Sequence, residues 1–285
     1  MKIAIIGATG MVGHVLYREL KNNNINVIGI GRRKIKDEVV QLDLYNDPEK
    51  LKLYLQNNKF DIIINCSAIL VNESNINRLQ AVYINSYFPN LLADLFKNTS
   101  TKIIHLSTGG VFSGNDDCYY EDSPLSPQTY YGITKAAGEF INDKDLVIRN
   151  DFWGPDIKKN GTGLFNWFLN QQGTVTGYTN VFFNGISNVE FSRILFDLIK
   201  FNGIIHIGTK NKYSKYDFLK KILSVFSLNN INILKDDNQS KNVYLKSKKD
   251  LPLINDLDTM MNDIHKYIKD NYHYYKDILN GNINW

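Results

Sequence analysis

The sequence has few cysteines and no long apolar run. Cys66 and Cys118 are its two cysteines in 285 residues, and no metal-ligand spacing surrounds either one, which argues against a disulfide framework or a cysteine-rich metal centre. The N-terminal apolar run ends at Gly7, so it is too short for a signal peptide, and no later run is long enough to span a bilayer. We therefore expect a cytoplasmic protein with no metal and no membrane partner.

An excess of one charge sign is also nearly absent. Lys and Arg number 33 against 29 Asp and Glu, which gives a net charge of +4, and the basic residues are interspersed with acids. Because no dense basic tract would follow a phosphate backbone, no nucleic-acid partner is predicted. A hydrophobic fraction of 43% with 22% charged residues is typical of a globular protein with a large core.

Short apolar runs of strand length alternate with helical patterns through the first 150 residues. Strands that are apolar on both faces and separated by helices predict a parallel sheet covered on both sides. The fold class is therefore α/β, a doubly wound parallel sheet of the Rossmann type. We expect strands over residues 3–6, 26–30, 39–42, 61–65, 102–107 and 146–149, and helices over 11–20, 48–55, 77–97 (with Pro89 as a kink or boundary) and 130–141.

The pattern changes after Asn150, where glycines divide the chain into shorter pieces and aromatic residues gather. We predict a dinucleotide-binding domain over residues 1–150 and a smaller C-terminal substrate-binding lobe over 151–285. Residues 186–207, with a helix over 189–200 and a strand over 204–207, are expected to rejoin the first domain. The remainder of the lobe is expected to be helical.

The first strand-to-helix junction carries three glycines in a GxxGxxG spacing, Gly7, Gly10 and Gly13. At such a junction the glycines give a tight turn, close approach of the backbone to a pyrophosphate, and close packing of helix on strand. The free amide groups at the helix N-terminus favour the negative charge of the pyrophosphate. The junction therefore predicts a dinucleotide site, to which Thr9, Met11 and Val12 also contribute.

The end of the second strand favours NADPH as that dinucleotide. A carboxylate there would hydrogen-bond the adenosine ribose of NAD, but the sequence has Arg32 and Arg33 and no acid. Guanidinium groups match phosphate geometry, so both arginines are expected at the 2′-phosphate, with NADH left as an alternative. The non-functional alternative is a solvated basic loop. Further cofactor contacts are expected, by their position after strands, from Asp43, Leu44, Cys66, Ser67 and Ala68.

Three residues carry the predicted chemistry. Thr108 follows the fifth strand, and Tyr131 and Lys135 stand four residues apart, on one face of the next helix. When hydride adds to a carbonyl, the oxygen becomes an alkoxide and needs a proton, which a tyrosine hydroxyl can give. The unperturbed pKa of tyrosine is about 10, and a lysine cation stabilises the phenolate. With Thr108 holding the carbonyl oxygen, the three predict reduction of a ketone.

With these motifs the chain resembles the extended short-chain dehydrogenase/reductases, and within them the dTDP-4-dehydrorhamnose reductase group. The resemblance rests on residues 7–13, 107–114, 131–139 and 146–149 and covers essentially the whole length. It implies an NADPH-dependent oxidoreductase of polysaccharide biosynthesis that reduces the 4-keto group of a UDP- or dTDP-linked 6-deoxyhexose, giving for example UDP-N-acetyl-L-rhamnosamine or dTDP-L-rhamnose. It also implies Thr108, Tyr131 and Lys135 as the catalytic set.

The chain departs from the family's pattern in two places. The family usually has an acid after Ser-Thr, where this chain has Gly109, and usually has Arg-Thr-Ser where this chain has Arg149, Asn150 and Asp151. Relatives that both epimerise and reduce, such as GDP-fucose synthase, place a cysteine where Gly110 stands here. We therefore expect no epimerase activity, and Cys118, further along the chain, is the alternative thiol.

The predicted substrate contacts are less specific than the catalytic set. Phe152 and Trp153 would cover the sugar or a base, or would serve as core aromatics. Asn180 and Asn184 would hydrogen-bond sugar hydroxyls, or would serve turns. Asn85, Gly109 and Asn150 complete the expected substrate set.

Two other functions stay open at this point. A nucleotide-sugar epimerase or dehydratase would use the same fold, but dehydratases need extra acids beside the catalytic threonine, as in Thr-Asp-Glu. A non-catalytic NADPH-binding regulatory protein is the alternative from another class, although such proteins commonly lose the tyrosine or the lysine. The partner in the preferred interpretation is a nucleotide-sugar substrate, and a homodimer is left open.

Overall fold

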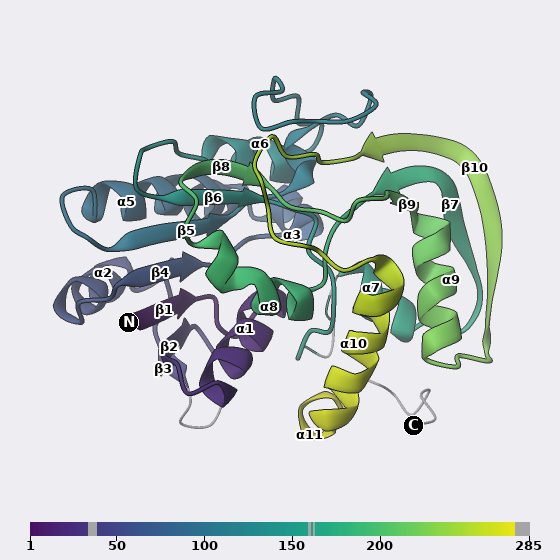
Figure 1. Cartoon of the computed structure of the whole chain (residues 1–285), viewed down its shortest axis with the longest axis horizontal. Coiled ribbons are helices and arrows are strands. Elements are labelled where there is room, and N and C mark those ends of the chain that lie inside the picture. The colour runs from purple at the N-terminus through teal and green to yellow at the C-terminus, as the bar shows by residue number, and fades with distance from the viewer. Residues whose placement is uncertain (34–38, 159–160, 162, 277–285) are drawn as a thin grey trace.

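The chain folds around a parallel sheet of seven strands, seen on the left of Figure 1. The computed structural model describes residues 1–33, 39–158, 161 and 163–276. From one edge of the sheet to the other the strands are β3 (Val39–Gln41), β2 (Asn26–Gly31), β1 (Lys2–Ile6), β4 (Ile62–Asn65), β5 (Lys102–Leu106), β6 (Leu146–Arg149) and β8 (Gly203–His206). The order reverses between β1 and β4, which confirms the predicted doubly wound fold and places a binding crevice at their carboxyl ends.

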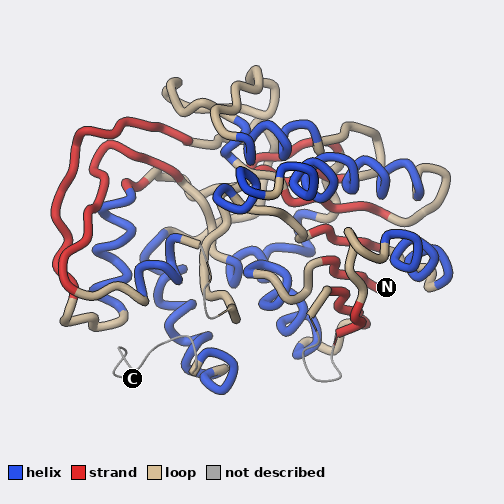
Figure 2. Tube along the Cα trace, turned by 180° about the vertical axis from the view of Figure 1, so that it is seen from behind, coloured by secondary structure: helices blue, strands red, loops and turns tan. Residues whose placement is uncertain are grey.

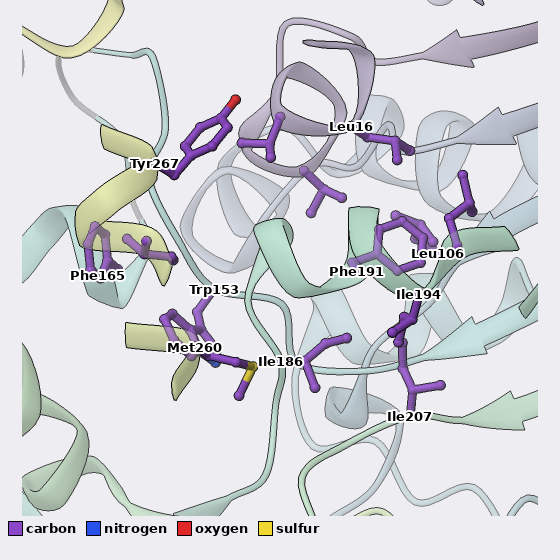
Figure 3. Close-up of a cluster of buried hydrophobic side chains, with 14 of the residues drawn as sticks. Leu16, Leu106, Trp153, Phe165, Ile186, Phe191, Ile194, Ile207, Met260 and Tyr267 are labelled. Atoms are coloured by element: carbon purple, nitrogen blue, oxygen red, sulfur yellow. The ribbon is translucent and has the colours of Figure 1, made fainter. Parts of the chain in front are cut away.

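Alternate residues of the central strand point to opposite faces, and each face has its own core. Ile3 and Ile5 of β1 lie in one cluster with residues of α1 (Met11–Asn22) and α8 (Asn188–Leu198), part of which Figure 3 shows. Ala4 and Ile6 lie in a second cluster with residues of α2 (Pro48–Asn57) and α5 (Phe88–Leu95). This alternation is what a strand buried on both faces requires.

The helix expected over residues 77–97 is built from consecutive segments. α4 (Arg78–Val82) is followed by a π-helical stretch (Tyr83–Tyr87) and then by α5, with Pro89 in the first turn of α5. A proline costs least in a first turn, because no hydrogen bond is required there from its nitrogen. The sequence analysis expected no element just before this helix, but the structure has α3 (Val71–Ile76).

The second half of the chain adds α8 and β8 to the large sheet and builds a lobe with a three-stranded sheet (Figure 2). That sheet has the order β10 (Ile231–Val243), β7 (Gly173–Phe183), β9 (Tyr213–Ser214), and it packs beside α9 (Lys215–Val225). The lobe also contains α7 (Leu164–Leu169), α10 (Leu257–Asp270) and α11 (Tyr272–Tyr275). Within the described ranges, no helix combines the length and the apolar character that a bilayer crossing requires.

The expectation that the lobe is helical beyond residue 207 was wrong for β9 and β10. β10 is rich in Asn, Asp and Lys and mostly exposed, so its own residues have little strand propensity. Its backbone instead pairs in parallel with β7, from Ile231 opposite Gly173 to Val243 opposite Phe183. The strand is therefore specified by a partner distant in the sequence.

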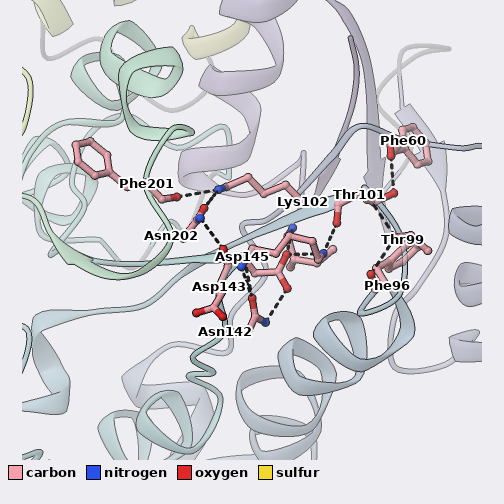
Figure 4. A network of polar contacts seen from close by, with 12 residues as sticks. Phe60, Phe96, Thr99, Thr101, Lys102, Asn142, Asp143, Asp145, Phe201 and Asn202 are labelled. Carbon is pink, nitrogen blue, oxygen red and sulfur yellow. Dashed lines mark hydrogen bonds and ion pairs between the residues drawn. The ribbon is translucent and has the colours of Figure 1, made fainter.

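A polar network ties together the edge of the large sheet that lies away from the crevice (Figure 4). The buried Asp145 carboxylate accepts hydrogen bonds from the Ile103 backbone at 2.7 Å and from Lys144 Nζ at 2.8 Å. Lys102 Nζ donates to the Phe201 carbonyl at 2.8 Å. These groups lie at the amino ends of β5 and β6, so we assign them to stability.

Candidate active site

Thr108, Tyr131 and Lys135 line one cavity, although they come from different elements. Thr108 caps a short 3₁₀ helix (Gly109–Val111) after β5, and its hydroxyl accepts the Gly110 N–H at 3.0 Å. Tyr131 and Lys135 lie on α6 (Tyr130–Ala137), whose N-cap Thr129 accepts the Gly132 N–H. The cavity, here called the central cavity, has a volume of about 370 Å³.

Lys135 is almost completely buried, with 1% of its surface exposed. Its Nζ lies 2.6 Å from the Leu106 carbonyl, to which it donates, and 3.1 Å from Nε2 of His105. Burial lowers the pKa of Lys135 to about 8, although the nearby Glu139 carboxylate acts in the opposite direction. An amine with this pKa exchanges protons readily near neutral pH.

The phenol of Tyr131 lies beside two polar side chains. Burial raises its pKa to about 12, a hydrogen bond with Thr108 lowers it, and Asp151 raises it when that carboxyl group is ionised. Thr108 Oγ in turn lies 3.0 Å from Oδ1 of Asp151. In the structure without ligand, Tyr131 is therefore held as a neutral phenol, which is the form that can donate a proton.

The glycine turn lines a second cavity of about 110 Å³, here called the turn cavity. Gly7 has a φ of +83°, and a Cβ at this position would lie 3.0 Å from the backbone of Cys66 and Ser67. The predicted cofactor residues that line the turn cavity are Gly7, Thr9, Gly10, Arg32, Arg33, Asp43, Leu44, Cys66, Ser67 and Ala68, and Met11 and Val12 line the central cavity.

Gly13 lines neither cavity and packs α1 against β1. A Cβ on Gly13 would lie 2.3 Å from the Gly7 carbonyl oxygen and 2.8 Å from its carbon. Since both atoms are backbone, they move only with the turn itself. We expect Gly13→Ala to cost about 1–3 kcal/mol of unfolding free energy and to weaken dinucleotide binding. Urea unfolding and a cofactor titration check this, and an unchanged variant in both would contradict the packing argument.

The second strand ends in two exposed arginines at the turn cavity. Arg33 donates to the Thr9 carbonyl at 2.6 Å, which places its guanidinium over the glycine turn. The Asp43 carboxylate accepts hydrogen bonds from the backbone of Tyr45 and Asn46, so it also holds the turn that follows β3. Lys34, which follows the two arginines in the sequence, lies outside the described residues.

Some of the predicted substrate residues reach the cavities. Asn150 and Phe152 line the central cavity. Phe152 and Trp153 line a third cavity of about 320 Å³, here called the lobe cavity. The Trp153 indole is nevertheless buried, and it donates to the Gly185 carbonyl and the Tyr213 hydroxyl.

Four predicted substrate residues lie outside the three cavities. Asn85 is buried and hydrogen-bonds both backbone groups of Ile69. Asn184 is buried and bonds to Thr209 and Leu245, which joins β7 to the segment after β10. The Asn180 amide donates to the Asp237 carbonyl, and the Gly109 N–H donates to Asp151 Oδ1 at 3.0 Å. These groups have protein partners in the structure, and their direct contact with a substrate stays a prediction.

Sequence reasoning missed several residues that line the site. Lys215 and Lys241 line the lobe cavity, and Asp151 and Val71 line both the central and the lobe cavity. Asp156 and Lys158 line the central cavity, where Lys158 also borders the turn cavity. α9 and β10 are brought to the site only by tertiary folding, and no local pattern marked their lysines. Asp151 was noticed as a departure from the family's pattern, which was the available signal.

Adjacent cavities share residues, so they form one continuous crevice. The turn and central cavities share Gly10, Cys66 and Ser67, and the central and lobe cavities share Thr108 and Tyr131. The catalytic candidates thus stand between a glycine turn with arginines and a lobe with lysines. The three side chains therefore face both the glycine turn and the cationic side chains of the lobe cavity.

The family described as the RmlD substrate binding domain matches residues 1–149, a little more than half of the chain. The chain belongs to this family. The match contains the glycine turn and all three catalytic candidates, and it confirms the resemblance to the dTDP-4-dehydrorhamnose reductase group.

Curated relatives match about half of the chain. The chain is 33% identical over 142 residues to a probable dTDP-4,6-dihydroxy-2-methyloxan-3-one 4-ketoreductase of Streptomyces antibioticus, over 49% of this chain and 45% of the relative. It is 31% identical over 152 residues to a dTDP-4-dehydrorhamnose reductase of Streptomyces griseus, over 51% of this chain and 47% of the relative. It is also 31% identical over 164 residues to methionine adenosyltransferase 2 subunit beta of Xenopus laevis, over 54% and 48%. The chain thus spans about half the length of the curated relatives it matches.

Solved structures resemble the whole chain in fold. A dTDP-4-dehydrorhamnose reductase of Clostridium acetobutylicum superposes with a TM-score of 0.79 at 22% identity, over 94% of this chain and 100% of that one. The Bacillus anthracis dTDP-4-dehydrorhamnose reductase in complex with NADP superposes with a TM-score of 0.78 at 19% identity, over 93% of this chain and 99% of that one. These likenesses confirm the fold of both halves, the lobe included.

Proposed function

We propose that this chain is an NADPH-dependent reductase of the 4-keto group of a nucleotide-activated 6-deoxyhexose, linked to UDP or dTDP, without epimerase activity. The observation that carries the proposal is the meeting of Thr108, Tyr131 and Lys135 in one cavity that continues to the glycine turn. The names of the Streptomyces relatives support the same reaction class.

Each of the three residues has a separate task in this proposal. The Thr108 hydroxyl holds the ketone oxygen by a hydrogen bond. Tyr131, a neutral phenol in the structure, gives its proton to that oxygen as the alkoxide forms. Lys135, held by the Leu106 carbonyl, supplies positive charge beside the phenolate when it is protonated.

The residues at the glycine turn fit a dinucleotide. Side chains on Gly7 or Gly13 would collide with backbone, so glycines allow this close turn, which leads directly into the N-terminus of α1, where N–H groups favour an anion. Gly10 caps α1 without a side-chain hydrogen bond, so no side chain of the cap occupies the position that a phosphate would take. A reduced nicotinamide, when bound, would supply the hydride.

The choice of NADPH over NADH is expected to depend on Arg32. Its side chain is exposed at the turn cavity and would pair with a 2′-phosphate. We expect Arg32→Ala to raise the Kd for NADPH on the order of tenfold and to leave the Kd for NADH unchanged. Arg78→Ala, outside the three cavities, is the matched control, and equal losses for both cofactors would contradict the assignment.

The lobe cavity supports an anionic second ligand. Lys215 and Lys241 bring two ammonium groups to it, and Phe152 and Phe182 add aromatic surface. Asn150 is buried at the central cavity with its Oδ1 bonded to the Ile186 N–H, while its Nδ2 lacks a hydrogen-bond partner among the described residues. A buried amide donor at a cavity wall is a natural partner for a sugar hydroxyl.

A substrate screen tests the proposed function. NADPH oxidation is followed by absorbance with UDP- and dTDP-linked 4-keto-6-deoxy sugars, in deuterated water. We expect oxidation with one or more of them and no deuterium at the carbons next to the ketone. Deuterium at those carbons would instead support an epimerase, which the absence of a side chain at Gly110 disfavours.

An accessory role is the second candidate, because one relative is named as the beta subunit of methionine adenosyltransferase 2. In that case the chain would bind NADPH and consume none with any of these sugars. The presence of Thr108, Tyr131 and Lys135 in one cavity favours the enzyme.

A further inference from the structure

The two departures from the family's pattern meet in space. A Cβ on Gly109 would lie 2.7 Å from Oδ2 of Asp151 and 2.5 Å from Val243. Asp151 therefore reaches its position because residue 109 has no side chain. Its Oδ1 accepts the Gly109 N–H at 3.0 Å and lies 3.0 Å from Thr108 Oγ. Asp151 thus puts a carboxyl group against residue 109, the position at which the family's sequence pattern has an acid.

Asp151 lines both the central and the lobe cavity, so it borders the space where substrate would bind. The charged and titratable groups that act on it come from separate elements: Tyr131 from α6, Lys215 from α9, Lys241 from β10 and Tyr213 from β9. The two lysines favour the ionised carboxylate. Burial favours the neutral acid.

The Thr108 hydroxyl connects Asp151 to Tyr131. A hydroxyl has one hydrogen and two lone pairs, and the Gly110 N–H occupies one lone pair. One hydrogen and one lone pair remain for Asp151 and Tyr131. If Asp151 is ionised, it must accept the Thr108 hydrogen. If Asp151 is protonated, it can donate to Thr108, and the Thr108 hydrogen is free to turn toward the ketone or Tyr131.

Resting on the proposed function, we infer that Asp151 is the proton source that restores Tyr131 through Thr108 after each reduction. The O–H bond of Tyr131 breaks as its proton passes to the product alkoxide. The phenolate then takes the Thr108 proton, and Thr108 takes the proton of Asp151. Asp151 is left as a carboxylate, which regains a proton from water in the open cavity when product leaves.

The electrostatics of the site agree with this direction. Burial raises the pKa of Asp151, against the lowering effect of its hydrogen bonds with Thr108 and Gly109. The donor is the protonated form, so turnover should be full below this pKa and fall as pH rises through it. Burial lowers the pKa of Lys135 to about 8, so Lys135 adds a pH limb of its own, and variants at residue 151 separate that limb from the limb of Asp151.

Asp151→Asn tests the relay, because an amide keeps the shape and an oxygen acceptor but has no acidic proton. We expect steady-state kcat to fall on the order of 100-fold. The decrease of kcat with rising pH that the titration of Asp151 causes in wild type should disappear. The first turnover, measured as NADPH oxidation in a stopped-flow instrument, should keep the wild-type rate, because Tyr131 starts protonated. Asp237→Asn, outside the three cavities, is the control.

A second measurement needs no turnover. Infrared spectra of ¹³C-aspartate-labelled protein should show a carboxylic-acid band at neutral pH that Asp151→Asn removes. If wild type reduces a 4-keto sugar but the variant keeps its kcat, or if the band is absent, the relay is wrong and the proposed function stands. If wild type oxidises no NADPH with any 4-keto sugar, the proposed function itself fails.

Discussion

Replacing Tyr131 by phenylalanine should lower kcat on the order of 10²- to 10⁴-fold, with no change in the Kd for NADPH. The phenol hydroxyl is the group placed to protonate the new alkoxide, and the ring that remains keeps the cavity wall. Burial already holds Tyr131 as a neutral phenol. Removing that proton donor should therefore affect the chemical step and leave binding intact.

Tyr130→Phe provides the matched control for this prediction. Tyr130 is the preceding residue on α6, and its hydroxyl lies 3.5 Å from the Arg78 carbonyl, outside the three cavities. Its kcat should equal that of wild type. A Tyr131→Phe protein that turns over like the control would remove Tyr131 from the mechanism.

The largest effect on stability is expected at Glu139, which forms a buried ion pair with Arg149 behind the site. The shortest contact is 2.7 Å, and the two side chains are 5% and 3% exposed. Glu139 also accepts the Ser107 hydroxyl at 2.5 Å, and Arg149 reaches His206 at 3.1 Å. Glu139→Ala would leave the guanidinium buried without its carboxylate partner, so we expect a loss of about 3–5 kcal/mol of unfolding free energy.

Urea unfolding measures this loss. Glu49→Ala breaks the exposed pair with Lys52, whose closest N–O distance is 3.6 Å, and should cost at most about 1 kcal/mol. If Glu139→Ala and Glu49→Ala lose the same small amount of unfolding free energy, the buried pair does not have the stabilising role assigned to it.

Much of the fold and of the catalytic set could be predicted because their signals are local. The glycine turn lies within seven consecutive residues, and Tyr131 and Lys135 share a helical face by their spacing alone. The apolar strands read as a parallel sheet because both faces of such strands are buried.

Asn85, Asn184 and the lobe were harder to predict, because their contacts join residues that are distant in the sequence. Asn85 and Asn184 were predicted as substrate contacts, and nothing in the sequence indicated protein partners 16 and 61 residues away. β10 gains its structure from β7, and the lysines of the lobe cavity come from α9 and β10. Gly109 and Asp151 were each noticed singly, but only the folded chain shows that the glycine makes room for the acid.

Transfer of deuterium from the reactive face of 4-deuterated NADPH tests the central claim most directly. The product of a single turnover with a UDP- or dTDP-linked 4-keto-6-deoxy sugar is analysed by mass spectrometry and NMR. The account predicts one deuterium, bonded to carbon 4 of the sugar, and none in the product mixture of Tyr131→Phe over the same time. Cofactor that binds but leaves every such sugar unlabelled would contradict it.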